Sequence, residues 1–230
     1  MGKTIVNRHT SLLILLAMCS SSAVVAQDAA QTAIIAKEVT AAIKREAEQG
    51  NLIAQNALAE MYVRGEGVAE NAAEAVKWYR LAADQGMASA QYNLGYMYDN
   101  GLGVAENDAE AAKWYRLAAG QGDAGAQFNL GVLYANGAGV AENDAEAVKW
   151  FIRAANQGDA TAQWALGAMY GSGRGVPESK VDAYFWWNLA AAQGNARAKE
   201  MKSLIAPLMT REQIAEAQRR SAAWKPTVKQ

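Results

Sequence analysis

The sequence lacks several features that would point to a chemical function. Its 230 residues carry a formal net charge of −1, so there is no basic excess of the kind that nucleic-acid binding needs. It has only three prolines, which argues against a linker-dominated or disordered chain. Hydrophobic residues make up 51% and charged residues 20%, a composition typical of one soluble folded unit. The chain also has a single histidine, His9, and a single cysteine, Cys19.

Both of these residues lie in a segment that resembles a secretory signal peptide. Lys3 and Arg8 precede an apolar run over residues 12–18, and small residues then lead to Ala26. A basic start, a short apolar centre and a small-residue exit are typical of such signals. The run is too short for an ordinary transmembrane helix. We therefore predict a signal peptide over residues 1–26, cleaved after Ala26, and export of the mature chain.

Cleavage at that point removes the main candidates for catalysis and metal binding. Without His9 and Cys19 the mature chain has no disulfide, no thiol nucleophile, no imidazole base and no zinc site of the usual ligand types. We therefore expect no cofactor and no metal. One alternative keeps the cysteine, because residues 16–19, Leu-Ala-Met-Cys, resemble a bacterial lipobox whose cysteine is lipidated. Met18 fits that motif poorly, so we expect membrane attachment only if Cys19 is lipidated.

What the chain does have is an internal repeat. A Gln-Gly dipeptide recurs every 36 residues, with its glycine at Gly50, Gly86, Gly122, Gly158 and Gly194. A fixed period in this range indicates a solenoid, in which each unit buries its apolar faces only against its neighbours. The dipeptides divide the chain into four units, residues 51–86, 87–122, 123–158 and 159–194.

Each unit is predicted to form two helices. In the second unit Ala90, Leu94 and Met97 fall at helical spacing and predict a first helix, helix A. The glycine-rich turn at residues 101–104 ends it, and Asn107 can cap a second helix, helix B, with Glu110 completing a capping box. Helix B carries two apolar stripes, which indicates contacts on two sides.

A glycine inside helix A repeats with the same period. It follows the central leucine at Gly95, Gly131 and Gly167. Because a helical glycine costs roughly 0.5–1 kcal/mol relative to alanine, its recurrence needs a packing reason. We expect the partner helix to approach closely there.

The motif A-Q-x-x-L-G-x-x-Y-x-x-G-x-G-V, followed by A-x-K-W-Y-x-x-A-A-x-Q-G, closely resembles the Sel-one-like repeat (SLR), a relative of the tetratricopeptide repeat. Residues 87–122 carry it without a gap, and the resemblance covers all four units. It implies an all-α fold, a right-handed superhelix of antiparallel helix pairs that acts as an adaptor and not as an enzyme. The repeats look bacterial, which would place the exported chain in the periplasm or outside the cell.

Both ends are predicted to cap the solenoid, which needs its last apolar faces covered. Residues 27–50 form an N-terminal helical cap, since residues 41–50 align with the end of a helix B. Residues 195–230 form C-terminal capping helices, of which the last spans 211–224 and begins with a capping box at Thr210 and Gln213. Burial under this last helix is the favoured explanation for the aromatic run at residues 184–187, with an exposed adhesive patch as the alternative.

Positions that vary between the repeats are the candidates for function. Two residues before the central leucine of helix A stand Tyr92, Phe128 and Trp164, on the face that lines the concave groove in tetratricopeptide-like solenoids. Exposed aromatics in a groove are typical anchors for a peptide or a partner helix. The alternative is that this aromatic ladder packs helix A against the next helix A. The candidate partner-binding residues are Tyr92, Tyr96, Asp99, Asn100, Phe128, Asn136 and Trp164.

The sequence therefore predicts an exported scaffold that binds a partner protein or peptide in its concave groove. The first alternative is a lipid-anchored envelope scaffold for cell-wall or polysaccharide export assembly. The second is a carboxylate-dependent cell-wall hydrolase. Most of its candidate acids recur with the repeat and are explained by structure, whereas Glu60 and Asp99 are unrepeated acids with no evident pairing. The sequence predicts neither the identity of this partner nor the oligomeric state.

Overall fold

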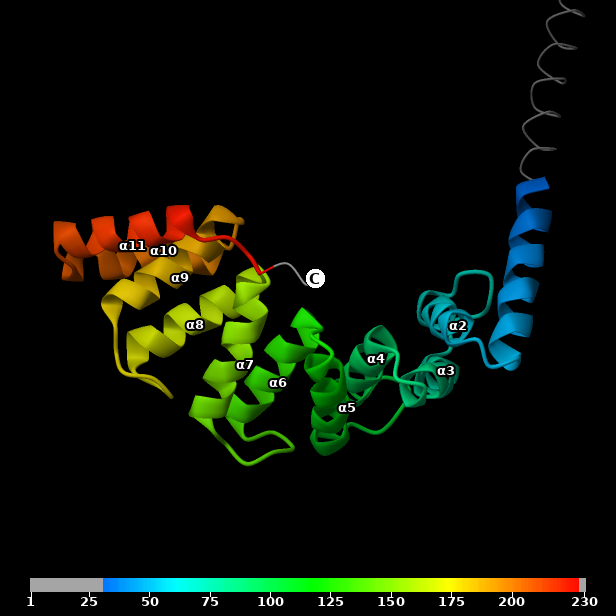
Figure 1. Cartoon of the computed structure of the whole chain (residues 1–230). Helices are drawn as coiled ribbons and strands as arrows, with labels where there is room; N and C mark the ends of the chain where they lie inside the picture. Colours follow the sequence, from blue (N-terminus) through cyan, green and yellow to red (C-terminus); the bar gives the residue numbers. More distant parts are fainter. Residues whose placement is uncertain (1–30, 228–230) are drawn as a thin grey trace, which may run out of the picture.

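The fold is known from a computed structural model that describes residues 31–227 (Figure 1). All regular structure in this range is helical, and contacts run mainly between consecutive helices, so the predicted α-solenoid is confirmed. Figure 1 shows the helix pairs following one another around a crescent. The predicted signal peptide, with His9 and Cys19, lies outside the described residues.

Each repeat contributes a helix A and a helix B of similar length, joined by a glycine-rich turn. The four A helices are α2 (Leu52–Arg64), α4 (Ala88–Asp99), α6 (Ala124–Asn136) and α8 (Ala160–Ser172). The four B helices are α3 (Ala72–Asp84), α5 (Asp108–Gly120), α7 (Asp144–Asn156) and α9 (Lys180–Ala192).

The helix starts follow the predicted caps, with one correction. The Asn107 side chain accepts a hydrogen bond from the Glu110 backbone N–H, as expected of an N-cap. The Glu110 carboxylate does not return the predicted bond to the cap and lies 3.3 Å from the Lys113 ammonium. Glu74 and Glu146 likewise pair with a lysine three residues along the helix, Lys77 and Lys149 respectively. A lysine three residues along the helix offers the carboxylate a charged partner, so only half of the capping box forms.

The repeated glycines of helix A lie where helix B comes closest. A Cβ on Gly131 would be 2.6 Å from the ring of Phe151, and one on Gly95 would be 2.8 Å from the ring of Tyr115. Real Cβ atoms do not come that close to a ring, so the predicted close approach is confirmed. The helix accepts the propensity cost of glycine because an aromatic side chain of helix B fills the freed space.

A ladder of glutamines joins successive repeats, and sequence reasoning did not predict it. Gln127 on α6 donates through Nε2 to the Ala119 carbonyl at 3.1 Å, and its Oε1 accepts from Gln157 Nε2 at 2.8 Å. Gln55, Gln91 and Gln163 make the same pair of bonds. These bonds satisfy a buried amide on each helix A. They also give a second donor to a carbonyl at the end of the preceding helix, which already accepts the backbone N–H of the glycine in the Gln-Gly dipeptide. They explain why both the Ala-Gln and the Gln-Gly dipeptides repeat.

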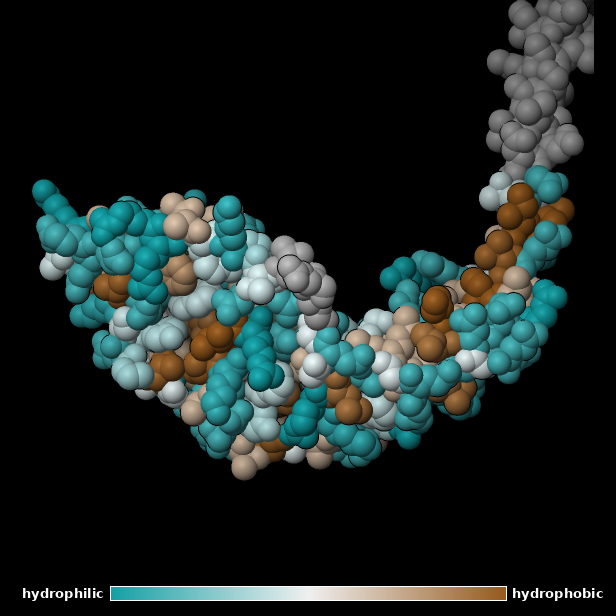
Figure 2. All heavy atoms as spheres, in the orientation of Figure 1, coloured by the Kyte–Doolittle hydropathy of each residue, from teal (hydrophilic) through white to brown (hydrophobic). Residues whose placement is uncertain are grey.

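The N-terminal helix, described over residues 31–48, takes the place of a helix B. Thr40 and Ala47 are buried, and the Ala47 carbonyl accepts from Gln55 Nε2 at 3.1 Å, as the Ala83 carbonyl does from Gln91. The opposite side of the same helix stays exposed. Figure 2 shows hydrophobic residues along this exposed part, where it rises from one end of the crescent.

At the other end the chain closes with α10 (Ala196–Ile205), a short 3₁₀ helix (Ala206–Leu208) and α11 (Arg211–Ala223). Thr210 and Gln213 form the predicted capping box. The helix α11 packs on α9, and all four residues of the aromatic run 184–187 are buried. Burial of that run is therefore confirmed, and the alternative of an exposed adhesive patch is wrong.

Candidate partner-binding groove

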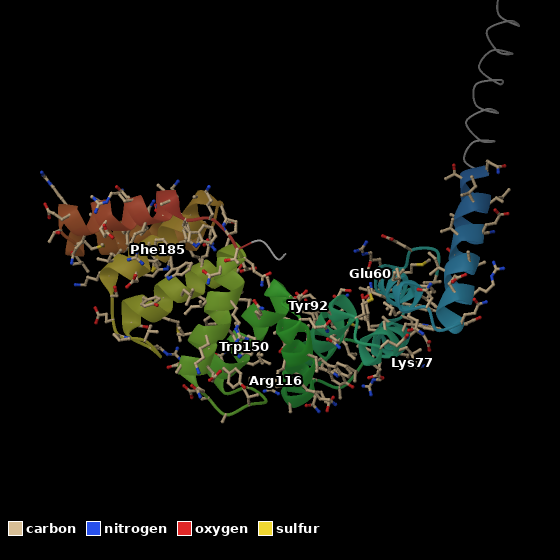
Figure 3. The ribbon with its side chains drawn as sticks, in the orientation of Figure 1. Glu60, Lys77, Tyr92, Arg116, Trp150 and Phe185 are labelled. Carbon is tan, nitrogen blue, oxygen red and sulfur yellow. The ribbon has the colours of Figure 1, made fainter. Side chains whose placement is uncertain are left out.

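The A helices line the inner side of the crescent. Figure 3 shows Glu60 and Tyr92, both from A helices, on the inner side, and Lys77 and Arg116, both from B helices, on the outer side. Two hollows open between neighbouring A helices on this side, α2/α4 and α6/α8, and a third lies between α8 and α10. They differ in chemistry because their lining positions vary from repeat to repeat.

The α6/α8 hollow has a volume of about 250 Å³ and brings together three of the predicted residues, Phe128, Asn136 and Trp164. Its walls are mainly apolar, and Val132 and Met169 complete them. Arg174 lies at its edge and is held by two hydrogen bonds to the Asp144 carboxylate, at 2.7 and 3.0 Å. The hollow can therefore accept an apolar side chain, with a fixed guanidinium beside it.

The α2/α4 hollow is also about 250 Å³, but polar and apolar side chains line it in similar measure. Glu60, Arg64, Tyr79 and Asn93 line it together with the predicted Tyr96, which is 44% exposed. Burial, with a smaller contribution from the nearby Glu60 carboxylate, raises the pKa of Tyr79 to about 12. The phenol therefore stays protonated at neutral pH and can serve as a hydrogen-bond donor.

Tyr92 differs from the other members of the aromatic ladder. Its ring centroid lies 6.0 Å from that of Tyr115, and a Cβ on Gly125 would be 3.0 Å from the Tyr92 ring. Tyr92 therefore packs between α4 and the start of α6. Phe128 also packs on a helix B aromatic, Phe151, at 5.7 Å, yet one side of it borders the open hollow. The packing interpretation thus describes Tyr92, whereas Phe128 borders open space and its role in partner binding stays a prediction.

Asp99 and Asn100 are tied to the scaffold and lie apart from the α6/α8 hollow. The Tyr115 hydroxyl donates to the Asp99 carboxylate at 3.1 Å. Burial raises the pKa of Asp99, and the bond from Tyr115 partly opposes that rise. Asn100 Nδ2 donates to the Tyr96 carbonyl at 2.9 Å and so closes the end of α4.

Sequence reasoning missed the α8/α10 hollow, which has a volume of about 430 Å³. It is lined largely by apolar side chains, among them Trp187, Met201, Ile205, Leu204 and Leu208. Leu204 and Leu208 are 61% and 66% exposed. The sequence pattern that could have predicted it is a pair of leucines four residues apart, in a segment that no longer matches the repeat motif.

Between residues 31 and 227 no group of three or more histidine, cysteine, aspartate or glutamate residues could hold a metal ion. None of the helices in that range is long and apolar enough to cross a membrane.

Stacked helix pairs with an open concave side define a solenoid repeat protein of the helix-pair class. The chain belongs to the Sel1 repeat family, which matches residues 52–87, 88–123, 124–159 and 160–195. The predicted resemblance to this repeat is confirmed. Proteins of this family are generally protein-interaction scaffolds and are typically not enzymes.

Two solved structures are similar to the chain over most of its length. One is a protective antigen of uropathogenic Escherichia coli strains that displays an SLR fold, with 35% identity and a TM-score of 0.74 over 81% of this chain. The chain spans only 41% of the length of that antigen. The other is a Sel1 repeat protein from Oxalobacter formigenes, with 34% identity and a TM-score of 0.70, covering 84% of both chains. No curated protein matches the chain.

Proposed function

We propose that this chain is an exported interaction scaffold that binds a protein or peptide partner along its concave groove. The observation that carries the proposal is the α6/α8 hollow, open on the inner side of the crescent and lined by Phe128, Val132 and Trp164. Apolar and aromatic walls of this kind take the anchor side chains of a partner. Arg174 at the edge adds a guanidinium for a carbonyl or carboxylate of the bound chain.

Photo-crosslinking tests where the partner binds. A photo-reactive amino acid at Asn136, which is exposed and lines the hollow, is expected to give a discrete adduct with the partner. The same amino acid at Lys113, on the surface of a helix B, is the control and is expected to give none. Adducts that form at Lys113 and not at Asn136 would place the interaction outside the groove and contradict the proposal.

A charge placed in the hollow is expected to abolish the interaction. Val132→Glu puts a carboxylate among apolar walls, and a bound side chain would have to desolvate it. We expect the adduct yield at Asn136 to fall by at least about tenfold, equivalent to roughly 1.4 kcal/mol. Lys149→Glu, an exposed change on α7, is the matched control and should leave the yield unchanged. Circular dichroism of both variants separates lost binding from lost folding.

Export is part of this proposal, and it rests on the sequence of residues 1–26. We expect the protein recovered from a bacterial envelope fraction to begin at Gln27, as read by mass spectrometry of the intact chain. Ala26→Arg removes the small residue at the cleavage point and is expected to leave the leader attached. An N-terminus at a lipid-modified Cys19 would favour the lipid-anchored scaffold. An intact Met1 in the cytoplasm would contradict export.

A further inference from the structure

The N-terminal helix exposes an apolar stripe that has no partner in the described chain. Ile35 and Val39, one turn apart, are 51% and 52% exposed, and Ile43 continues the stripe toward the body of the protein. By the 36-residue period, Val39 and Ile43 correspond to Ala75 and Tyr79, which are buried on α3. Those positions of a helix B face the helix A of their own unit, as Ala183 faces Gly171 in the fourth repeat. Val39 and Ile43 therefore stand at positions that a helix covers in the complete repeats, and Ile35 extends the apolar surface by one turn.

At the opposite end of the solenoid, a helix A lacks the helix B that would cover it. The helix α10 follows the phase of a helix A, with Asn195 as its cap where the fourth unit has Asp159. No helix B follows it in the usual place, because α11 packs on α9. Leu204 on α10 and Leu208 in the 3₁₀ helix after it stay exposed and line the largely apolar α8/α10 hollow of about 430 Å³.

These two surfaces cannot meet within one chain. The N-terminal helix is anchored on the first repeat: Thr40 lies against Gly67 in the turn after α2, and the Ala47 carbonyl accepts from Gln55 on α2. The hollow lies between α8 and α10. Figure 1 shows these elements at opposite ends of the crescent. A contact between them needs a second copy of the chain.

Charges beside the two surfaces are complementary. Glu38 and Arg45, seven residues apart, lie on one edge of the stripe, since such a spacing keeps two residues on one side of a helix. Glu178 and Lys180 line the hollow. None of these four residues makes an ion pair with another residue in the range 31–227. A helix seated in the hollow can pair Glu38 with Lys180 and Arg45 with Glu178.

We propose that the N-terminal helix of one copy docks, through Ile35 and Val39, into the α8/α10 hollow of a second copy. An amphipathic helix in an apolar groove is a common form of recognition. The two surfaces differ, so the contact joins copies head to tail and either closes by reciprocal exchange or extends into longer assemblies. Reciprocal exchange buries two such contacts in one complex, whereas an extended assembly has one contact for each pair of neighbours.

The test is the mass of the protein in solution, measured by light scattering or sedimentation over a wide concentration range. The wild-type protein, in the N-terminal form that the cell produces, is expected to rise from one chain to two or more. Val39→Glu and Leu204→Glu change exposed positions on the two surfaces and are each expected to hold the protein at one chain. Leu81→Glu, at an exposed leucine of α3 outside both surfaces, is the control and should associate like the wild type.

Mixing the two monomeric variants identifies the contact. The Val39→Glu chain keeps an intact hollow and the Leu204→Glu chain keeps an intact stripe, so the mixture is expected to form a one-to-one complex. A mixture that stays monomeric would overturn the proposal, because it would mean that the stripe and the hollow do not bind each other. A wild-type protein that is monomeric at all concentrations would overturn it too. Neither result bears on partner binding at the α6/α8 hollow.

A charge exchange gives an independent measurement on the same contact. Glu38→Lys is expected to weaken association by several-fold, because it sets two lysines against each other. Adding Lys180→Glu to the same chain restores an opposite-charge pair and is expected to recover the wild-type dissociation constant. Failure of the second change to rescue the first would contradict the proposed orientation of the helix in the hollow.

Discussion

Gly139→Ala is expected to destabilise the protein by about 2–5 kcal/mol, the largest effect of any single methyl group considered. Gly139 lies in the turn between α6 and α7 with φ +65, a left-handed conformation that costs other residues about 1–2 kcal/mol. A Cβ there would also lie 2.2 Å from the carbonyl carbon of Asp108, at the start of α5. Backbone cannot move aside as a side chain can, so overpacking adds about 1–3 kcal/mol.

Gly86→Ala is the matched control for that experiment. Gly86 also has a positive φ, of 90, but a Cβ on it would have nothing within 4 Å. We expect the free energy of unfolding of this variant to fall by only about 1–2 kcal/mol, the conformational cost of the positive φ. The free energy of unfolding in urea gives both values. Equal losses at the two sites would show that the turn does not rest on the preceding helix B as closely as described.

Gln163→Leu is expected to cost about 1–3 kcal/mol, although leucine is similar in size and more hydrophobic. The Gln163 side chain is fully buried, donates to the Ala155 carbonyl at 3.2 Å and accepts from Gln193 Nε2 at 2.9 Å. Leucine removes both bonds, and each contributes a net of about 0.5–1.5 kcal/mol. The Ala155 carbonyl keeps only its bond from the Gly158 N–H, at 2.9 Å. Thermal or urea unfolding measures the loss.

Gln193, which donates to Gln163, supplies the comparison for the Gln163→Leu variant. Gln193 is exposed, so Gln193→Leu breaks only one of the two bonds and leaves the bond from Gln163 to Ala155 in place. We expect a loss of about 1–3 kcal/mol, because the Oε1 of the fully buried Gln163 then has no donor. A loss well below about 1 kcal/mol would show that the pair of glutamines contributes little to the stability of the ladder.

The local features of the repeat were predictable because short stretches of sequence determine them. Asn107 caps α5 whatever lies beyond it, and a glycine after the central leucine signals a close approach. The return bond from Glu110 was not predictable in the same way. Lys113 competes for the carboxylate, and that competition depends on the directions of two long side chains.

The candidate groove was predictable only in part, because its open space depends on pairs of residues from different repeats. Tyr92 fills the gap between α4 and α6 because Gly125, 33 residues later, has no side chain to keep it out. Phe128 and Trp164 occupy the same repeat position and border an open hollow. The assignment of these residues to partner binding stays a prediction until the crosslinking experiment is done.

The sequence by itself determined the family, the helix pairs and the phase of the solenoid, because a 36-residue period records the same local interactions four times. The tertiary structure alone decided which faces remain open. The glutamine ladder, the α6/α8 hollow, the α8/α10 hollow and the unpartnered N-terminal stripe each depend on side chains about 30 or more residues apart, or on a neighbour that an end repeat lacks. Pattern in a sequence specifies contacts within a helix pair, whereas open surface is what remains after all the pairs have packed.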